Sequence, residues 1–363
     1  MKFLTLFLLL ALSLLNASEN PSDVQLKKMI GRMLIVGFDN EKLDANSTIV
    51  KMINKYDIGG VILFDRYFDV KSRVKNIRSP RQLQELTSSL HQLCKKPLLI
   101  SVDQEGGKVA RLKPAYGFSE IPSAKKLSEL SLEHAKNTYE KMAKMIKSEG
   151  INTNFAPVVD LALNPKNSVI VGLERSYGKS SKKVSAYAKI LIDAQKKEGI
   201  ISVLKHFPGH GSSLGDSHKG FVDVSQTWSE KELEPYKLLI KSKSVDMIMT
   251  AHVFNSHLDS KYPATLSYNV NTKLLRKKMH FHGVIVSDDL QMKAISQHYP
   301  LKEAVTLAIN AGVDMLLFGN QLGNQDIDEL VDVIFTQVKA KKIPYKRVVE
   351  SNKKIAQLFK KIK

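Results

Sequence analysis

Short runs of β-branched and other apolar residues alternate along the chain with longer stretches in which apolar residues recur at helical spacing. The apolar runs lie at residues 33–38, 60–64, 98–102, 154–159, 202–206, 246–251, 283–287 and 314–318. The stretches of helical spacing lie at residues 81–93, 126–147, 182–197, 230–241, 271–278, 301–309 and 326–339, and a last one begins at Tyr345. This alternation predicts parallel strands that are joined by crossover helices.

Eight strand and helix units in one chain predict a (β/α)8 TIM-type barrel. A doubly wound α/β sheet is the alternative fold. The composition shows no break and no internal repeat beyond the alternation itself, so we expect a single catalytic domain over residues 19–363. Long irregular stretches interrupt the pattern at 65–80, 115–123, 164–180, 208–227 and 254–268, and stretches of such length usually carry function.

A polar residue ends or follows the apolar run at five of the predicted strands. These residues are Asp103, Asp160, His206, His252 and Asp288. In a parallel barrel the carboxyl ends of all strands surround one open mouth, where the chemistry takes place. A single residue of this kind is more often part of a turn or a helix cap, but five together predict one shared pocket.

Composition and charge narrow the class of protein. Hydrophobic residues make up 43% and charged residues 25% of the 363 positions, which indicates a globular protein and excludes disordered and collagen-like classes. The one cysteine, Cys94, excludes an intramolecular disulfide and a zinc site built from several thiolates. The net charge of +19 favours anionic partners. The lysines are dispersed and no nucleic-acid-binding motif occurs, so we expect no nucleic-acid partner.

Residues 1–18 have the layout of a secretory signal. Lys2 precedes an apolar run that is too short to span a bilayer comfortably, and the small residues Ala17 and Ser18 follow it. An uncleaved membrane anchor is the alternative, because the cleavage site matches the usual small-residue pattern poorly. We expect an exported protein in a bacterial periplasm, with no stable membrane insertion after the leader is removed.

The segment KHFPGHGSSLGDSH, residues 205–218, carries three histidines in a glycine-rich loop. His206 and His210 have the spacing of helical zinc ligands, but a proline and a glycine between them oppose a helix. No His-x-His pair ends any predicted strand either, so we expect no metal. No phosphate-binding glycine pattern follows a strand, and we expect no cofactor.

An acid/base pair suits the same segment better. Asp216 and His218 are two residues apart, so the carboxylate can accept a hydrogen bond from one imidazole nitrogen while the other nitrogen faces a substrate. The alternative is a surface turn in which the aspartate caps the histidine. Gly209, Gly211 and Gly215 predict a loop that swings over the mouth and delivers the proton donor.

The segment GVIVSDDLQMKAI, residues 283–295, ends a buried strand on Asp288 and Asp289. Because side chains alternate along a strand, only one of the two carboxylates points along the barrel axis. A carboxylate in that position is suited to attack an electrophilic carbon. We expect the other to cap the helix that follows from Leu290.

A third segment, SVDQEGGKVARL at residues 101–112, ends a strand on Asp103 and leads to Arg111. Carboxylate and guanidinium groups hold sugar hydroxyls well, and Lys205 and Arg175 add further donors. One nucleophilic carboxylate, one proton donor and these polar groups predict substitution at the anomeric carbon of a sugar with retention of configuration. The donor is usually a second carboxylic acid, but a histidine can serve because the donor needs only a pKa near the working pH.

At these positions the sequence resembles glycoside hydrolase family 3, and within it the single-domain bacterial β-N-acetylglucosaminidases that act on peptidoglycan fragments. The matching segments are GGVILF (59–64), DQEGGKVARL (103–112), NFAPVVDL (154–161), ERSYG (174–178), KHFPGHG with DSH (205–211 and 216–218), MTAHV (249–253) and SDDLQM (287–292). The resemblance implies that Asp288 is the nucleophile, His218 the mobile acid/base and Asp216 its partner. The sugar-binding roles that it implies fall on Asp103, Arg111, Arg175, Lys205 and His206.

The resemblance implies a carbohydrate partner, namely peptidoglycan fragments that contain N-acetylglucosamine (GlcNAc). Two features depart from the family. This sequence has a predicted leader, whereas well-known cytoplasmic members of this branch lack one. The basic stretch 71–81 is also longer than the family's usual loop, and we expect this stretch to be a solvated loop. Three other functions stay open: a β-glucosidase, a GlcNAc phosphorylase of the same family, and a wall-binding protein without catalysis.

Overall fold

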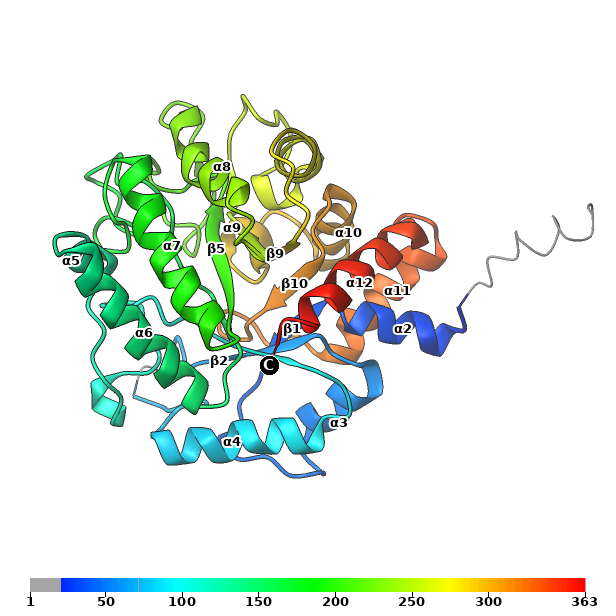
Figure 1. The fold of residues 1–363 in the computed structure, drawn as a ribbon. Helices are drawn as coiled ribbons and strands as arrows, with labels where there is room; N and C mark the ends of the chain where they lie inside the picture. Colours follow the sequence, from blue (N-terminus) through cyan, green and yellow to red (C-terminus); the bar gives the residue numbers. More distant parts are fainter. Residues whose placement is uncertain (1–20, 71, 363) are drawn as a thin grey trace, which may run out of the picture.

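Eight parallel strands close into a barrel with helices around it, as a computed structural model shows for residues 21–70 and 72–362 (Figure 1). The barrel strands are β1 Leu34–Gly37, β2 Gly60–Leu63, β3 Leu99–Val102, β4 Thr153–Asn154, β5 Ile201–Phe207, β7 Met247–Thr250, β9 Val284–Asp289 and β10 Met315–Phe318. The barrel strands lie side by side in the order in which they follow one another along the sequence, and pairing of β1 with β10 closes the ring. The predicted (β/α)8 barrel is confirmed, and a doubly wound sheet is excluded.

The helices surround the ring of strands. The longer ones are α2 Asp23–Gly31, α3 Thr48–Tyr56, α4 Pro80–Leu93, α6 Leu132–Ser148, α7 Ser181–Lys197, α8 Glu234–Lys241, α10 Leu301–Ala311, α11 Ile327–Lys339 and α12 Tyr345–Phe359. The short or irregular elements are η1 Pro114–Tyr116, α5 Ala124–Ser128, η2 Glu230–Leu233, η3 Ala264–Leu266, the π-helix η4 Asn269–Lys278 and α9 Lys293–Ser296. A separate two-stranded sheet pairs β6 Val222–Asp223 with β8 Val253–Phe254.

Two helices, α2 and α3, are not among the predicted ones. Each has nine residues, and an apolar pattern of that length gives a weak signal because short helices depend on tertiary packing. Helix α2 begins at a capping box in which the Ser22 hydroxyl accepts a hydrogen bond from the main chain of Gln25. The predicted helix 126–147 is in fact two helices, because Ser131 starts α6 as its N-cap.

The predicted strand 154–159 is wrong in its extent. Regular pairing stops after Asn154, the last residue of β4, and Pro157 has no N–H group to extend the ladder. The Ala156 N–H instead donates to the Asn154 carbonyl at 2.8 Å. The segment still runs beside β5, since the Val159 N–H donates to the Lys205 carbonyl at 2.9 Å.

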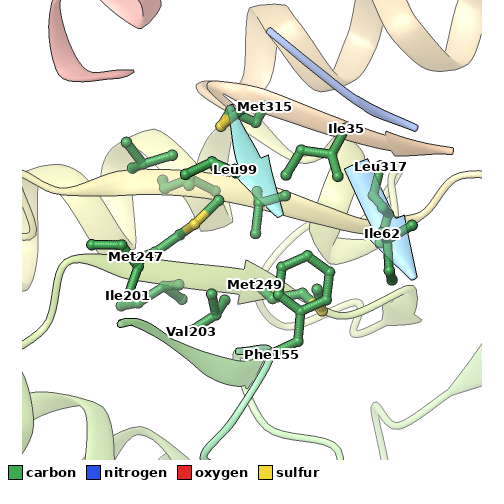
Figure 2. Packing of buried hydrophobic residues seen from close by; sticks show 14 of the residues in the cluster. Ile35, Ile62, Leu99, Phe155, Ile201, Val203, Met247, Met249, Met315 and Leu317 are labelled. Carbon is green, nitrogen blue, oxygen red and sulfur yellow. The ribbon is translucent and has the colours of Figure 1, made fainter. Parts of the chain in front are cut away.

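Apolar side chains fill the barrel, which is therefore a packed core and not a pore (Figure 2). The side chains labelled there are all at most 4% exposed: Ile35, Ile62, Leu99, Phe155, Ile201, Val203, Met247, Met249, Met315 and Leu317. Along β5 the two-residue period runs from Ile201 and Val203 to Lys205, which is the first charged side chain above this core. Polar groups at the strand ends therefore gather at the carboxyl end of the barrel.

The expected leader, residues 1–18, lies outside the described residues, as does Lys71 of the basic stretch 71–81. Within that stretch Lys75 is fully buried, so the expectation of a wholly solvated loop is wrong at this position. Its ammonium group donates to the Asn320 carbonyl and lies 3.1 Å from an Asp39 carboxylate oxygen. Of the helices in the described part of the chain, none is long and apolar enough to cross a membrane.

The packing of the barrel core predicts how a substitution there changes the free energy of unfolding. Replacing the fully buried Leu99 by alanine is expected to lower the free energy of unfolding by about 2–5 kcal/mol, since the methyl groups lose their contacts and leave a cavity. Leu132→Ala, at a side chain that is 49% exposed, is the matched control and should cost less than about 1 kcal/mol. Urea denaturation followed by circular dichroism measures both; equal losses would contradict the packing described.

Candidate active site

A chain of alternating charges crosses the mouth of the barrel. The Lys205 ammonium group of β5 lies 2.7 Å from one carboxylate oxygen of Asp103 and 2.7 Å from one of Glu105. The other Asp103 oxygen accepts a hydrogen bond from Arg111 at 3.3 Å. Asp103 directly follows β3 and Lys205 lies on β5, so the ends of two strands meet here. The structure thus brings together three predicted sugar-binding residues.

The chain of charges continues to the other side of the mouth. Two guanidinium nitrogens of Arg175 donate to the two carboxylate oxygens of Glu105, each at 2.8 Å. Another contact joins Arg175 to His206 Nε2 at 3.2 Å, and His206 Nδ1 lies 2.7 Å from Asp160 Oδ2. Since Arg175 can only donate, His206 accepts at Nε2 and donates from Nδ1 to Asp160. Arg175 and His206 are therefore held in fixed orientations.

The charged side chains that cross the mouth keep their charges at neutral pH. Burial by itself would raise the pKa of Glu105, but Arg175 and Lys205 outweigh it and lower the pKa to about 2. The same balance lowers the pKa of Asp103, where Lys205 and Arg111 overcome burial. For Lys205, burial alone would lower the pKa, and the two carboxylates raise it instead. The mouth therefore presents fixed carboxylates and cations that can hold sugar hydroxyls.

Sequence reasoning missed Glu105 and Asp65. Glu105 lies two residues beyond Asp103, in the same DQEGG segment, and its place in the polar segment that follows a strand was the available signal. Asp65 directly follows the predicted strand 60–64, and its buried carboxylate lies 2.5 Å from the Lys113 ammonium group and 4.0 Å from Arg111. Nothing local in the sequence indicates these contacts, because they join segments 48 and 46 residues apart.

Asp288 lies near the end of β9 and faces a group of imidazoles. Burial alone would raise the pKa of its carboxyl, but His252, His206 and His218 outweigh burial and hold the pKa below its ordinary value. His252 is fixed in turn, since its Nε2 lies 2.9 Å from the Asp289 carbonyl oxygen and its Nδ1 lies 2.8 Å from the Thr265 hydroxyl. The Asp288 carboxylate is therefore ionised at neutral pH and is available as a nucleophile.

The neighbouring Asp289 has a different environment. One of its carboxylate oxygens accepts from the Gln291 N–H at 3.0 Å and the other from the Gly319 N–H at 3.2 Å. Burial raises the pKa of Asp289 to about 7, with a contribution from the charge of Asp288. The expected cap of the following helix is wrong in detail, because α9 begins only at Lys293 and Asp289 holds a turn before it.

Asp216 and His218 form the expected pair. The Asp216 carboxylate lies 2.8 Å from His218 Nδ1 and also accepts from the His218 main-chain N–H at 3.0 Å. Burial by itself lowers the pKa of His218, but this hydrogen bond and the charge of Asp288 raise it above the ordinary value. The hydrogen bond to His218 lowers the pKa of Asp216 to about 2.

The loop that carries this pair is docked against α9 and the segment after it, which follow β9 in the chain. The Ala294 main-chain N–H, six residues after Asp288, donates to the Ser217 carbonyl at 3.2 Å. A second contact joins Phe221 of the loop to His298, with ring centroids 5.7 Å apart. Residues 216–218 and Asp288 are distant in sequence and lie on the same side of the mouth.

The base of the loop is more firmly packed than its glycines suggest. A Cβ atom at Gly211 would lie 1.7 Å from the Leu161 carbonyl oxygen, so this glycine permits a close approach of two chain segments rather than a swing. The buried Glu232 accepts the Gly211 N–H at 2.9 Å. These contacts fix the loop as far as Gly211.

His210, the third histidine of this segment, lies in the base of the loop. Burial lowers its pKa to about 4, and its Nδ1 lies 2.7 Å from the Ser213 hydroxyl. Over residues 21–70 and 72–362 no group of three or more His, Cys, Asp or Glu side chains is arranged to hold a metal ion. The polar side chains of the mouth instead contact one another.

Comparison with known proteins identifies the family. The model of the glycosyl hydrolase family 3 N-terminal domain matches residues 25–358. The chain is 36% identical over 296 residues to the β-hexosaminidase of Haemophilus influenzae, with 79% of each chain covered. It is 32% identical over 338 residues to β-hexosaminidase A of Pseudoalteromonas piscicida, with 86% of this chain and 55% of that protein covered.

Solved structures show the same likeness. The family 3 β-N-acetylglucosaminidase from Paenibacillus sp. FPU-7 superposes with a TM-score of 0.83 at 31% identity, over 92% of this chain and 62% of that one. The chain therefore spans less than two thirds of the Paenibacillus protein and of the Pseudoalteromonas relative. Residues 25–358, which the family model matches, include every strand of the barrel and every side chain of the mouth described above. The chain belongs to glycosyl hydrolase family 3.

Proposed function

We propose that the protein is a retaining exo-β-N-acetylglucosaminidase, which removes terminal β-linked GlcNAc from peptidoglycan-derived fragments through a covalent glycosyl-aspartate intermediate. The observation that carries the proposal is the docking of the Asp216–His218 pair against the helix that follows the strand of Asp288, where the charges of His218 and Asp288 act on each other. A nucleophilic carboxylate and a separate proton donor at one mouth are what substitution with retention requires. The names of the related β-hexosaminidases support the choice of sugar.

In the first step the Asp288 carboxylate attacks C1 of the terminal sugar. His218, protonated and held by Asp216, donates its proton to the glycosidic oxygen, so the leaving group departs as a neutral alcohol. The pKa of Asp288 is lowered and that of His218 is raised, so both shifts favour the ionised acid beside the imidazolium. The sugar hydroxyls are held meanwhile by Asp103, Arg111, Arg175, Lys205 and His206.

In the second step the neutral His218 accepts a proton from water, and the resulting hydroxide attacks C1. The bond between C1 and Asp288 breaks, and the electron pair returns to the carboxylate. The imidazole regains its positive charge, so the enzyme is ready for the next substrate. In this proposal the acetamido group is a recognition element and does not act as the nucleophile. Export directed by residues 1–18 would place the reaction in the periplasm, where cell-wall fragments occur.

Loss of the nucleophile is the first test. Asp288→Asn should lower kcat/KM on an aryl N-acetyl-β-glucosaminide about a thousandfold or more, because the amide cannot form the glycosyl ester. Asp289→Asn is the matched control, since the pKa of about 7 makes its carboxyl partly neutral already, and it should retain activity within about tenfold. An Asp288→Asn enzyme that keeps more than about a tenth of the rate contradicts the assignment. Faster wild-type hydrolysis of the aryl β-glucoside would instead support a β-glucosidase.

The role of His218 is tested by varying the leaving group. His218→Ala should lose about a hundredfold or more on a disaccharide, whose alcohol leaving group needs a proton, and much less on a dinitrophenyl glycoside, whose phenolate does not. Steady-state rates on the two substrates give the comparison within a single variant. Equal losses on both substrates would remove the proton-donor assignment.

The pH profile tests the Asp216–His218 pair. His218 must be protonated to act as the acid, so activity is present below its raised pKa and is lost as the pH rises through that value. Asp216→Asn removes the carboxylate that raises this pKa, and the basic limb of kcat/KM should move to lower pH while the acidic limb stays in place. An unchanged basic limb in the variant would show that another group sets it.

A further inference from the structure

A second concave site lies at the opposite end of the barrel from the mouth. A cavity of about 300 Å³, here called the basal cavity, opens between the amino ends of β7 and β9 and the carboxyl-terminal half of α12. Its apolar wall is formed by Ile240, Val245, Phe281, Val284 and Leu358. Its volume is at the lower end of the range of small-molecule sites. The proposed glycosidase reaction uses none of these residues.

Positive charge dominates the polar lining of the basal cavity. Three lysines line it, Lys243, Lys354 and Lys361, and two histidines, His280 and His282, accompany them. Among the described lining residues Asp246 is the one carboxylate, and it forms an ion pair with Lys361. Three ammonium groups and one carboxylate leave the cavity with two uncompensated positive charges when both imidazoles are neutral. Such a surplus around a concave site attracts an anion.

The carboxylate behind Lys354 does not neutralise it. The Lys354 ammonium group lies 3.5 Å from Asp314, at the long end of the ion-pair range. The Asp314 carboxylate is fully buried and already pairs with Arg276 and, at 3.1 Å, with Arg347. The charge of Asp314 is thus shared by three cations, of which Arg347 also lies 3.5 Å from Glu350. Lys354 is consequently a half-buried cation with room for another counter-ion on its cavity side.

We propose that the basal cavity binds the phosphomonoester of a small organic molecule. A phosphomonoester carries about −1.5 to −2 charges at neutral pH, which matches the surplus charge of the lysines. Lysine ammonium groups bind phosphate as point charges, and a phosphate offers three terminal oxygens that can serve several of them at once. The apolar wall beside the lysines can contact the organic part of the ester. This assignment does not depend on the proposed glycosidase activity.

The lining residues offer matched variants for the test. Isothermal titration calorimetry of the full chain with glycerol 3-phosphate should show one site. Lys354→Gln and Lys243→Gln should each weaken binding about tenfold or more, because each removes a charge-assisted contact. Lys353→Gln is the control: it removes the same charge from the neighbouring position of α12, at an exposed residue that does not line the cavity. Lys243 is exposed as well, so its replacement leaves the buried cluster around Asp314 intact.

The same titrations distinguish the source of the phosphate and its location. Tighter binding of glycerol 3-phosphate than of inorganic phosphate supports the apolar wall as part of the site, and tighter binding of inorganic phosphate contradicts the proposal. Addition of GlcNAc should leave the affinity unchanged, since the mouth is at the other end of the barrel; competition by GlcNAc would overturn the assignment. No saturable binding, or equal losses in the Lys353 and Lys354 variants, would also overturn it.

Discussion

The pairing of β1 with β10 is the constraint on which the functional site depends. It closes eight parallel strands into a ring, and the apolar core inside the ring keeps the polar residues that follow the strands at the carboxyl end. Loops that lie far apart in the chain are thereby directed to one mouth. The hydrogen bond from the Ala294 N–H to the Ser217 carbonyl is one direct consequence, because it ties the loop of Asp216 and His218 to α9, the short helix that follows β9.

Within the mouth, opposite charges hold one another in place. Lys205 lies between Asp103 and Glu105, and Glu105 in turn holds Arg175 with two hydrogen bonds. Burying charged groups costs several kcal/mol for each ion unless partners of opposite sign surround it. Here Asp103, Glu105, Lys205 and Arg175 each have such a partner. The result is a set of donors and acceptors that need little reorganisation when a polar substrate arrives.

The two adjacent carboxyls of the SDD segment show how environment separates like groups. Asp288 faces imidazoles, which lower its pKa, whereas Asp289 is buried among main-chain N–H groups and has a pKa near 7. Opposite shifts in neighbouring acids separate their chemical roles. The geometry favours Asp288 as the reactive carboxylate and leaves Asp289 a positioning role beside Gly319.

Much of the fold could be predicted from sequence because hydrophobic periodicity reports directly on strands and helices. Prediction from this periodicity failed where the apolar pattern covered few residues, as in α3, or was interrupted, as in the strand that ends at Asn154 before Pro157. The candidate site was predictable as far as polar residues follow apolar runs. Glu105 was missed because its contact with Arg175 spans 70 residues, and only the closed barrel reveals that the two meet.

The central claim is that a sugar becomes covalently attached to Asp288. The direct measurement is mass spectrometry of the His218→Ala enzyme, quenched in acid during turnover of a dinitrophenyl N-acetyl-β-glucosaminide and digested with a protease. The account predicts that one N-acetylglucosaminyl group is attached to the peptide that contains Asp288. A modified peptide elsewhere in the chain, or full turnover with no trapped sugar and inverted configuration of the product, would contradict it.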